Sequence, residues 1–175
     1  MAATYIVYNS ADATTSSAVK QPTGTSIRTM MQLAPGVPIK VFEWGCSFDG
    51  DSANTPGIVE LIDTGTVPAT VTTAFGVNDV QTFTDPNAAA NTSGGSGLPL
   101  NLGVALSGFA TASTTEGSYT APTRMGDPQL IAPTGQYLKQ FPLGREWYVP
   151  AGHFLHVRAN FGTSVNMLCY VQFEI

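Results

Sequence analysis

The chain has 175 residues, of which 43% are hydrophobic and only 11% are charged, so it suits one folded domain and is too poor in charge to be disordered. The net charge is −5 and the seven basic residues are scattered, which argues against binding to nucleic acid. No window holds the roughly 18 apolar residues of a membrane span. The N-terminus lacks the basic start and apolar run of a signal peptide, so we expect synthesis in the cytoplasm and no membrane partner.

Apolar and polar residues alternate with period two along most of the chain, which predicts β-strands. No segment has the pattern of an amphipathic helix, and 12 prolines and 18 glycines punctuate the strands. The sequence therefore predicts one all-β domain over residues 1–175, a two-sheet antiparallel β-sandwich of jelly-roll type. In chain order, the predicted strands cover 4–9, 25–33, 38–50, 57–65, 69–75, 104–114, 117–133, 136–143, 153–161 and 166–175.

Two regions depart from this pattern. Residues 85–98 lose all periodicity and are rich in Gly, Ser and Asn, which predicts a long flexible loop. Residues 1–24 are expected to supply an N-terminal strand and arm. Because both ends of the chain carry strands, we expect the last strand to lie inside a sheet and its deletion to damage folding.

Strand alternation also assigns side chains to faces. In 38–50 it places Phe42, Trp44, Cys46 and Phe48 on one face, with Val41, Glu43 and Ser47 on the other. In 166–175 it separates Met167, Cys169, Val171, Phe173 and Ile175 from Leu168, Tyr170, Gln172 and Glu174. Both cysteines fall in apolar patterns, which favours buried free thiols, with a disulfide between neighbouring strands as the alternative.

Residues 144–161 hold both histidines of the chain, His153 and His156, and are predicted to form two strands of a hairpin joined at 150–152. A proline ends a ladder and a glycine permits positive φ, so a stabilising role is favoured. The two histidines are predicted to point to opposite faces and cannot chelate one metal ion as a helical pair would. If His156 packs in a subunit interface, stability should change between about pH 5 and 7.

Other signals of chemistry are weak. Ser107 lacks the glycine two positions earlier that a nucleophile elbow requires. Asp49, Asp51 and Asn54 lack the spacing of a calcium loop. A glycosidase-type pair drawn from Glu43, Glu60, Asp63, Asp49 and Asp51 stays open, although solvated strand faces and turns explain these residues more simply. We therefore predict no enzyme and no catalytic, cofactor-binding or metal-binding residues.

Four stretches together carry a family resemblance. They are TMMQLAPGVPIKVFEWGCSFDG (29–50), VELIDTGTVPATVT (59–72), TEGSYTAPTRMGD (115–127) and QYLKQFPLGREWYVPAGHFLHVRA (136–159). In these the chain resembles a group of small structural proteins encoded by tailed bacteriophages. The resemblance covers most of the chain and is weakest over 85–98, and it transfers no site residues.

The resemblance implies a capsid decoration (cement) protein that docks on the phage head. Its partners would be the major capsid protein or other virion proteins, and it would be a homo-oligomer, with a trimer favoured, located in the virion. A tail, neck or fibre component is the alternative within this class. A carbohydrate-binding β-sandwich is the alternative of another class, with candidate stacking residues Tyr5, Tyr8, Trp147 and Tyr148.

Overall fold

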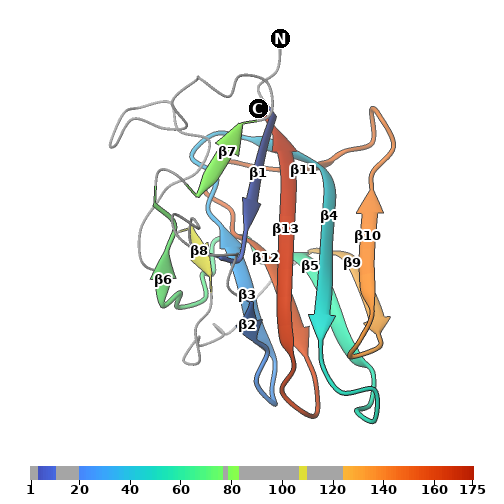
Figure 1. Cartoon of the computed structure of the whole chain (residues 1–175). Helices are drawn as coiled ribbons and strands as arrows, with labels where there is room; N and C mark the ends of the chain where they lie inside the picture. The colour runs from blue at the N-terminus through green and yellow to red at the C-terminus, as the bar shows by residue number, and fades with distance from the viewer. Residues whose placement is uncertain (1–3, 11–19, 77–78, 83–106, 110–123) are drawn as a thin grey trace.

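The computed structural model describes residues 4–10, 20–76, 79–82, 107–109 and 124–175, and these form two antiparallel sheets with no helix among them. The predicted loop over 85–98 and residues 11–19 of the predicted arm lie outside this description. The front sheet (Figure 1) has the order β10 (Gln136–Gln140), β4 (Ile39–Asp49), β13 (Asn166–Glu174), β1 (Thr4–Tyr8) and β7 (Val80–Thr82). β11 (Trp147–Val149) also pairs with β4, and β2 (Gln21–Pro22) pairs with β13.

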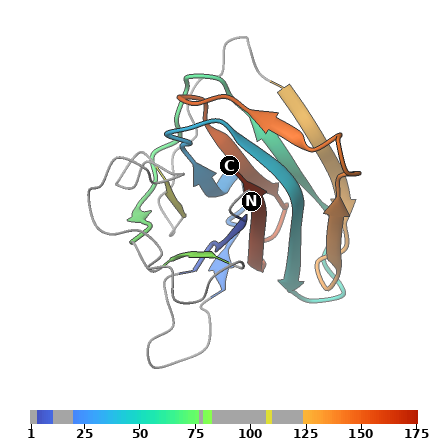
Figure 2. The ribbon, with the colours of Figure 1, turned by 90° about the horizontal axis from the view of Figure 1, so that it is seen from above.

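The back sheet lies behind it and completes the sandwich (Figures 1 and 2). Its order is β6 (Thr73–Ala74), β8 (Gly108–Phe109), β3 (Arg28–Leu33), β12 (Leu155–Asn160), β5 (Gly57–Asp63) and β9 (Arg124–Ile131). When the longer strands are followed along the chain, every connection between consecutive ones crosses from one sheet to the other, except the connection from β5 to β9. The resulting orders, β1-β13-β4-β10 and β3-β12-β5-β9, are those of a jelly roll, so the predicted fold is confirmed.

The last strand has the central position that the sequence predicts. β13 lies between β4 and β1 and pairs with both over most of its length. Its faces are confirmed as far as Glu174, because the four inward side chains are fully buried while Leu168, Tyr170, Gln172 and Glu174 are only partly covered. The inward position predicted for Ile175 was wrong, because Ile175 follows the end of the strand and is 43% exposed. The inward set is Met167, Cys169, Val171 and Phe173.

The faces of β4 differ from the prediction at one end. Gln172 is opposite Glu43 and Phe173 is opposite Val41, so Phe42 is the extra residue of a β-bulge. The bulge turns Val41 to the same inner side as Trp44, and both are fully buried. Period-two alternation across Phe42 was therefore wrong, because it assumes an uninterrupted ladder.

The predicted hairpin over 144–161 is also wrong. β11 pairs with β4 in the front sheet, whereas β12 pairs with β3 and β5 in the back sheet. Residues 150–154 form a corner between the sheets, in which the Gly152 amide donates to the Pro35 carbonyl at 3.0 Å. The local signals were correct, since the strand ends before Pro150 and Gly152 has φ of +80°, but they do not determine which strand each half pairs with.

The predicted strand over 69–75 is reduced to Thr73–Ala74, and that over 104–114 has only Gly108–Phe109 as a described strand. The segment after β5 instead packs on the outer side of β3, where the Ala69 amide donates to Gln32 Oε1 at 2.7 Å. This contact covers Gln32, which is fully buried although it lies on a face that alternation would leave to solvent.

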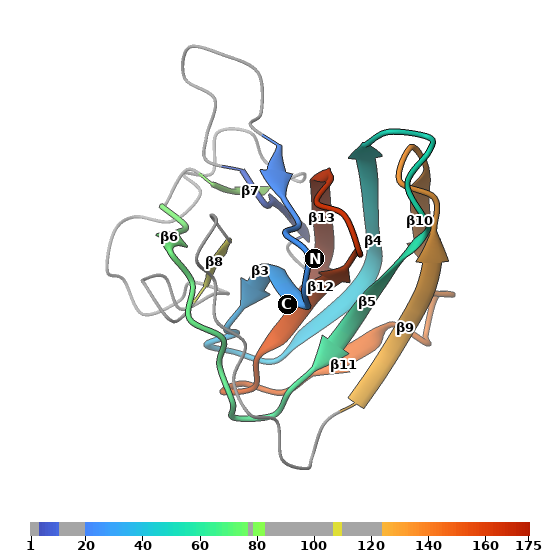
Figure 3. The same ribbon diagram turned by 90° about the horizontal axis from the view of Figure 1, so that it is seen from below.

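The two sheets meet closely along β9 and β10, which a short turn joins (Figure 3). Asp127 of β9 is buried there and accepts hydrogen bonds from Trp44 Nε1 at 3.0 Å, Tyr137 OH at 2.8 Å and Gln129 Nε2 at 2.7 Å. The Trp44 and Tyr137 bonds cross from the front sheet to the back sheet. Asp127 therefore holds this side of the sandwich together.

Candidate functional site

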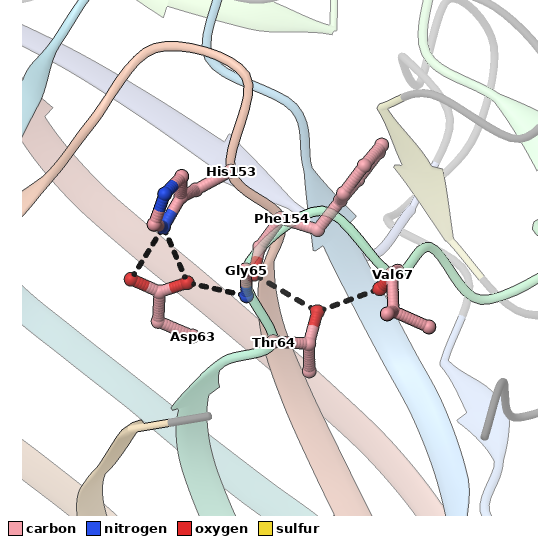
Figure 4. Close-up of polar contacts among 6 residues, drawn as sticks. All are labelled: Asp63, Thr64, Gly65, Val67, His153 and Phe154. Carbon is pink, nitrogen blue, oxygen red and sulfur yellow. Dashed lines mark hydrogen bonds and ion pairs between the residues drawn. The ribbon is translucent and has the colours of Figure 1, made fainter. Parts of the chain in front are cut away.

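The richest polar chemistry at the predicted histidine segment is an Asp63–His153 pair at the end of β5 (Figure 4). His153 Nδ1 lies 3.0 Å from Asp63 Oδ1 and 3.2 Å from Oδ2, and the Asp63 side chain is 1% exposed. Asp63 Oδ1 also accepts from the Gly65 amide at 2.8 Å, which closes a local turn. A carboxylate on Nδ1 orients an imidazole as in acid–base catalysis.

The surroundings of this pair give it a structural role instead. The Thr64 amide donates to Phe154 O at 2.9 Å, and the Phe154 amide donates to Gly65 O at 2.8 Å, so the segment after β5 and the corner before β12 are held together. The Thr64 hydroxyl also lies 3.3 Å from Phe154 O (Figure 4). The nearby Thr64 hydroxyl donates to Val67 O at 2.7 Å. Its proton is therefore committed to a carbonyl, and the pair lacks an activated nucleophile at that position.

His156 lies in the interior of the single chain and not at its surface. It is fully buried, and its Nδ1 lies 3.5 Å from the Thr29 hydroxyl. Burial, helped by the charge of Arg158 and opposed by that of Asp63, lowers the pKa of His156 from 6.5 to about 3. The predicted pH effect assumed that His156 packs in a subunit interface. The structure instead buries His156 within one chain, so any pH effect must come from this burial.

The five carboxylates considered as a glycosidase pair have separate partners. Asp49 pairs with Lys20, Asp51 Oδ1 accepts from the Ala53 amide at 2.9 Å, and Glu60 Oε1 accepts from Arg158 Nε at 2.8 Å. Asp63 contacts His153, and Glu43 lies on the opposite sheet. Within the described ranges no three His, Cys, Asp or Glu side chains gather as a metal site would require.

Ser107 and the cysteines are buried. Ser107 Oγ accepts from the Ala34 amide at 2.9 Å, so it serves the packing of β3 against β8. Cys46 and Cys169 are directly opposite on β4 and β13 and are both free thiols, as the favoured interpretation had it. Burial raises the pKa of Cys46 to about 12 and that of Cys169 well above its usual value.

In the described part, no helix is long and apolar enough to cross a bilayer.

A groove of about 480 Å³ lies on the outer side of the front sheet, within the usual range of ligand sites. Strand register explains its position. One row across the sheet contains Tyr8, Tyr170, Gly45 and Leu138. Their strands β1, β13, β4 and β10 are consecutive neighbours in the front sheet (Figure 1). Gly45 has no side chain, so the Tyr170 ring lies close over the strand at this point of the row. We call this the outer-face groove, whose lining includes Tyr8, Ser47, Gln136, Leu138, Leu168 and Tyr170.

The Tyr170 ring is held rigidly in this groove. It leans over Gly45 so closely that a Cβ there would lie 2.7 Å from its ring, and its hydroxyl donates to Glu43 Oε1 at 2.7 Å. Desolvation, together with the Glu43 hydrogen bond and charge, raises the pKa of Tyr170. Glu43 is itself buried and accepts from Gln172 Nε2 at 3.1 Å and Gln140 Nε2 at 2.6 Å. Glu43 is therefore held by two glutamine side chains while it fixes the Tyr170 hydroxyl.

The aromatic residues proposed for sugar stacking divide into two groups. Tyr5 stacks on Phe173 at 5.5 Å and Trp147 contacts Phe141 at 6.3 Å, so both belong to packing. Tyr8 lines the outer-face groove, and Tyr148 is exposed elsewhere on the same sheet. Sequence reasoning missed Tyr170, although a glycine inside an otherwise bulky strand is a signal of close approach at that point.

Searches of protein-family models, curated proteins and solved structures find no match to this chain.

Proposed function

We propose that this protein is a structural component of a tailed-phage virion, and that it acts as a decoration protein on the head. The observation that carries the proposal is a set of three exposed apolar side chains on β10, β11 and the turn between them. Leu138 is 58% exposed, Leu143 is 95% exposed and Tyr148 is 50% exposed. We call these three residues the apolar edge.

A contact role follows from the arrangement of these side chains. β10 and β11 both pair with β4 at the same border of the front sheet, opposite Gly45 and Lys40, so Leu138 and Tyr148 project from one face. Scattered apolar residues are normal on a surface, but several along one sheet border favour a protein partner. The low charge of the chain suits broad packing against a capsid surface. The buried core of a protein–protein interface is poor in charged residues.

The jelly-roll fold suits this class. Jelly rolls are common in viral capsid proteins and also in lectins, so the architecture is compatible with both. The family resemblance favours the capsid side and a homo-oligomer, in particular a trimer. A place in the tail, neck or a fibre would use the same edge with fewer copies.

The deciding experiment is quantitative mass spectrometry of purified particles of the phage that encodes this chain. A copy number of the same order as the major capsid protein would support decoration. A handful of copies would support the tail, neck or fibre alternative. Absence from the particles would refute a structural virion role.

A docking assay with empty shells tests the surface itself. Leu143→Ser should weaken binding to the shells because it removes the most exposed apolar side chain of the apolar edge. Leu130→Ser is the matched control, since Leu130 is 69% exposed but lies on β9 of the other sheet. Equal binding by the two variants and by the unmodified protein would contradict the assignment of the apolar edge.

A further inference from the structure

We propose that the outer-face groove binds a pyranose ring of a neutral glycan. This goes beyond the proposed virion role and rests on separate observations. The groove has the two features that sugars require, an aromatic surface for the apolar face of the ring and neutral polar groups for its hydroxyls.

The aromatic surface consists of Tyr8 and Tyr170. Their ring centroids are 5.8 Å apart with an interplanar angle of 45°, so the two rings form an open angle. Tyr8 is 36% exposed. The Tyr170 ring lies against Gly45, and its hydroxyl donates to Glu43. A ring that is already fixed loses little side-chain entropy when a ligand stacks on it.

The polar groups of the groove are uncharged. Ser47 and Gln136 are opposed on β4 and β10, in the row next to Gly45, with Leu168 opposite Ser47 on β13. A hydroxyl and an amide can each donate and accept, as sugar hydroxyls do. Because Tyr170 donates its proton to Glu43, its phenol oxygen remains an acceptor. None of the six lining side chains named above is charged, which favours a neutral ligand over an anion or a cation.

The position of the groove disfavours an extended peptide. Its central row crosses β13 and β4, whose backbones are paired on both sides by β1 and β10. Strand addition needs the unpaired backbone of a sheet edge, which the middle of this sheet does not offer. Recognition must therefore use side chains, and these match a polyhydroxylated ring with one apolar face.

A glycan array of pyranose oligosaccharides, probed with the full-length protein, tests the proposal, followed by calorimetry on the strongest ligand. Tyr8→Ala should weaken binding by about tenfold or more, because it removes one of the two stacking rings. Gly45→Ala should abolish binding although it deletes no lining side chain, since its Cβ displaces the partly exposed Tyr170 ring into the groove. Thermal melts of both variants confirm that the fold is intact.

Tyr148→Ala is the matched control, because Tyr148 is an exposed tyrosine on the same sheet outside the groove. It should bind as the unmodified protein does. Silence of the unmodified protein across the array would overturn the proposal. Affinities of Tyr8→Ala and Gly45→Ala equal to that of the unmodified protein would also overturn it. So would an oligomer that Tyr8→Ala dissociates, since a second copy of the chain would then occupy the groove.

Discussion

Acid should destabilise the protein through His156. The pKa of His156 is lowered from 6.5 to about 3 in the folded chain, first by burial and then by Arg158, with Asp63 opposing. Below the pKa of His156 in the unfolded chain, the unfolded chain binds a proton at this residue and the folded chain does not. The free energy of unfolding therefore decreases as the pH decreases. The contribution of His156 to the free energy of unfolding is constant above about pH 6.5. It decreases by about 1.4 kcal/mol for each pH unit between there and about pH 3.

The expected loss is large against the stability of a domain. At about pH 4.5 the linkage amounts to about 3 kcal/mol, and it approaches about 5 kcal/mol below pH 3. A typical domain has only about 5–15 kcal/mol in total. Urea unfolding followed by circular dichroism, at pH 7 and about pH 4.5, measures this difference directly.

A comparison of variants isolates the histidine from the carboxylates. His156→Gln should lower stability at pH 7 but lose about 3 kcal/mol less than the unmodified protein on going to about pH 4.5. His153→Gln is the control, because His153 is partly exposed and its loss leaves the His156 contribution in place. If the unmodified protein and His156→Gln lose equal stability between the two pH values, the reasoning from burial is wrong.

Three further predictions concern the packing of the sandwich. Asp127→Ala should cost about 3 kcal/mol in urea unfolding, because the buried Trp44 indole and Tyr137 hydroxyl lose their acceptor, and Asp127→Asn should cost less; equal stability of Asp127→Ala and the unmodified protein would contradict this. Gly126→Ala should cost about 1–3 kcal/mol, because its Cβ would overlap the Trp147 ring, whereas Gly162→Ala, with its nearest neighbour at 3.9 Å, should be nearly neutral. Cys46 and Cys169 should react with a thiol reagent only on unfolding, because both are buried and the pKa of each is raised; rapid labelling under native conditions would show that β4 and β13 separate.

Local patterns were sufficient for the fold class. Alternation along 166–175 identifies the inward face of β13, and the strand content with its Pro and Gly punctuation predicts a jelly roll. These signals succeed because they depend on side chains near one another in the chain. They fail at Phe42, where a bulge shifts the ladder, and at 150–154, where the chain changes sheets.

The candidate sites depend on contacts that alternation does not contain. Tyr8, Gly45, Leu138 and Tyr170 meet only because β1, β4, β10 and β13 are neighbours in one sheet. Asp127 likewise becomes a buried acceptor only when β9 faces Trp44 across the sandwich. The sequence could indicate Tyr8 as a candidate stacking residue, but strand order was needed to give it a partner.

Leu138 connects the two proposals and allows them to be separated. It lines the outer-face groove and also belongs to the apolar edge, whereas Leu143 belongs only to the edge and Tyr8 only to the groove. Leu138→Ser should therefore weaken both glycan binding and shell docking. Leu143→Ser should weaken docking alone, and Tyr8→Ala should weaken glycan binding alone.

The pattern of losses identifies which proposal fails. If Tyr8→Ala weakens docking as well, the shell itself covers the groove, and the groove is part of the capsid contact and not a glycan site. If Leu143→Ser leaves docking intact while Leu138→Ser abolishes it, contact with the shell is centred on the groove side of β10. Separate losses in Tyr8→Ala and Leu143→Ser would mean that a docked protein keeps its groove accessible, so that a decorated head could present a glycan-binding surface.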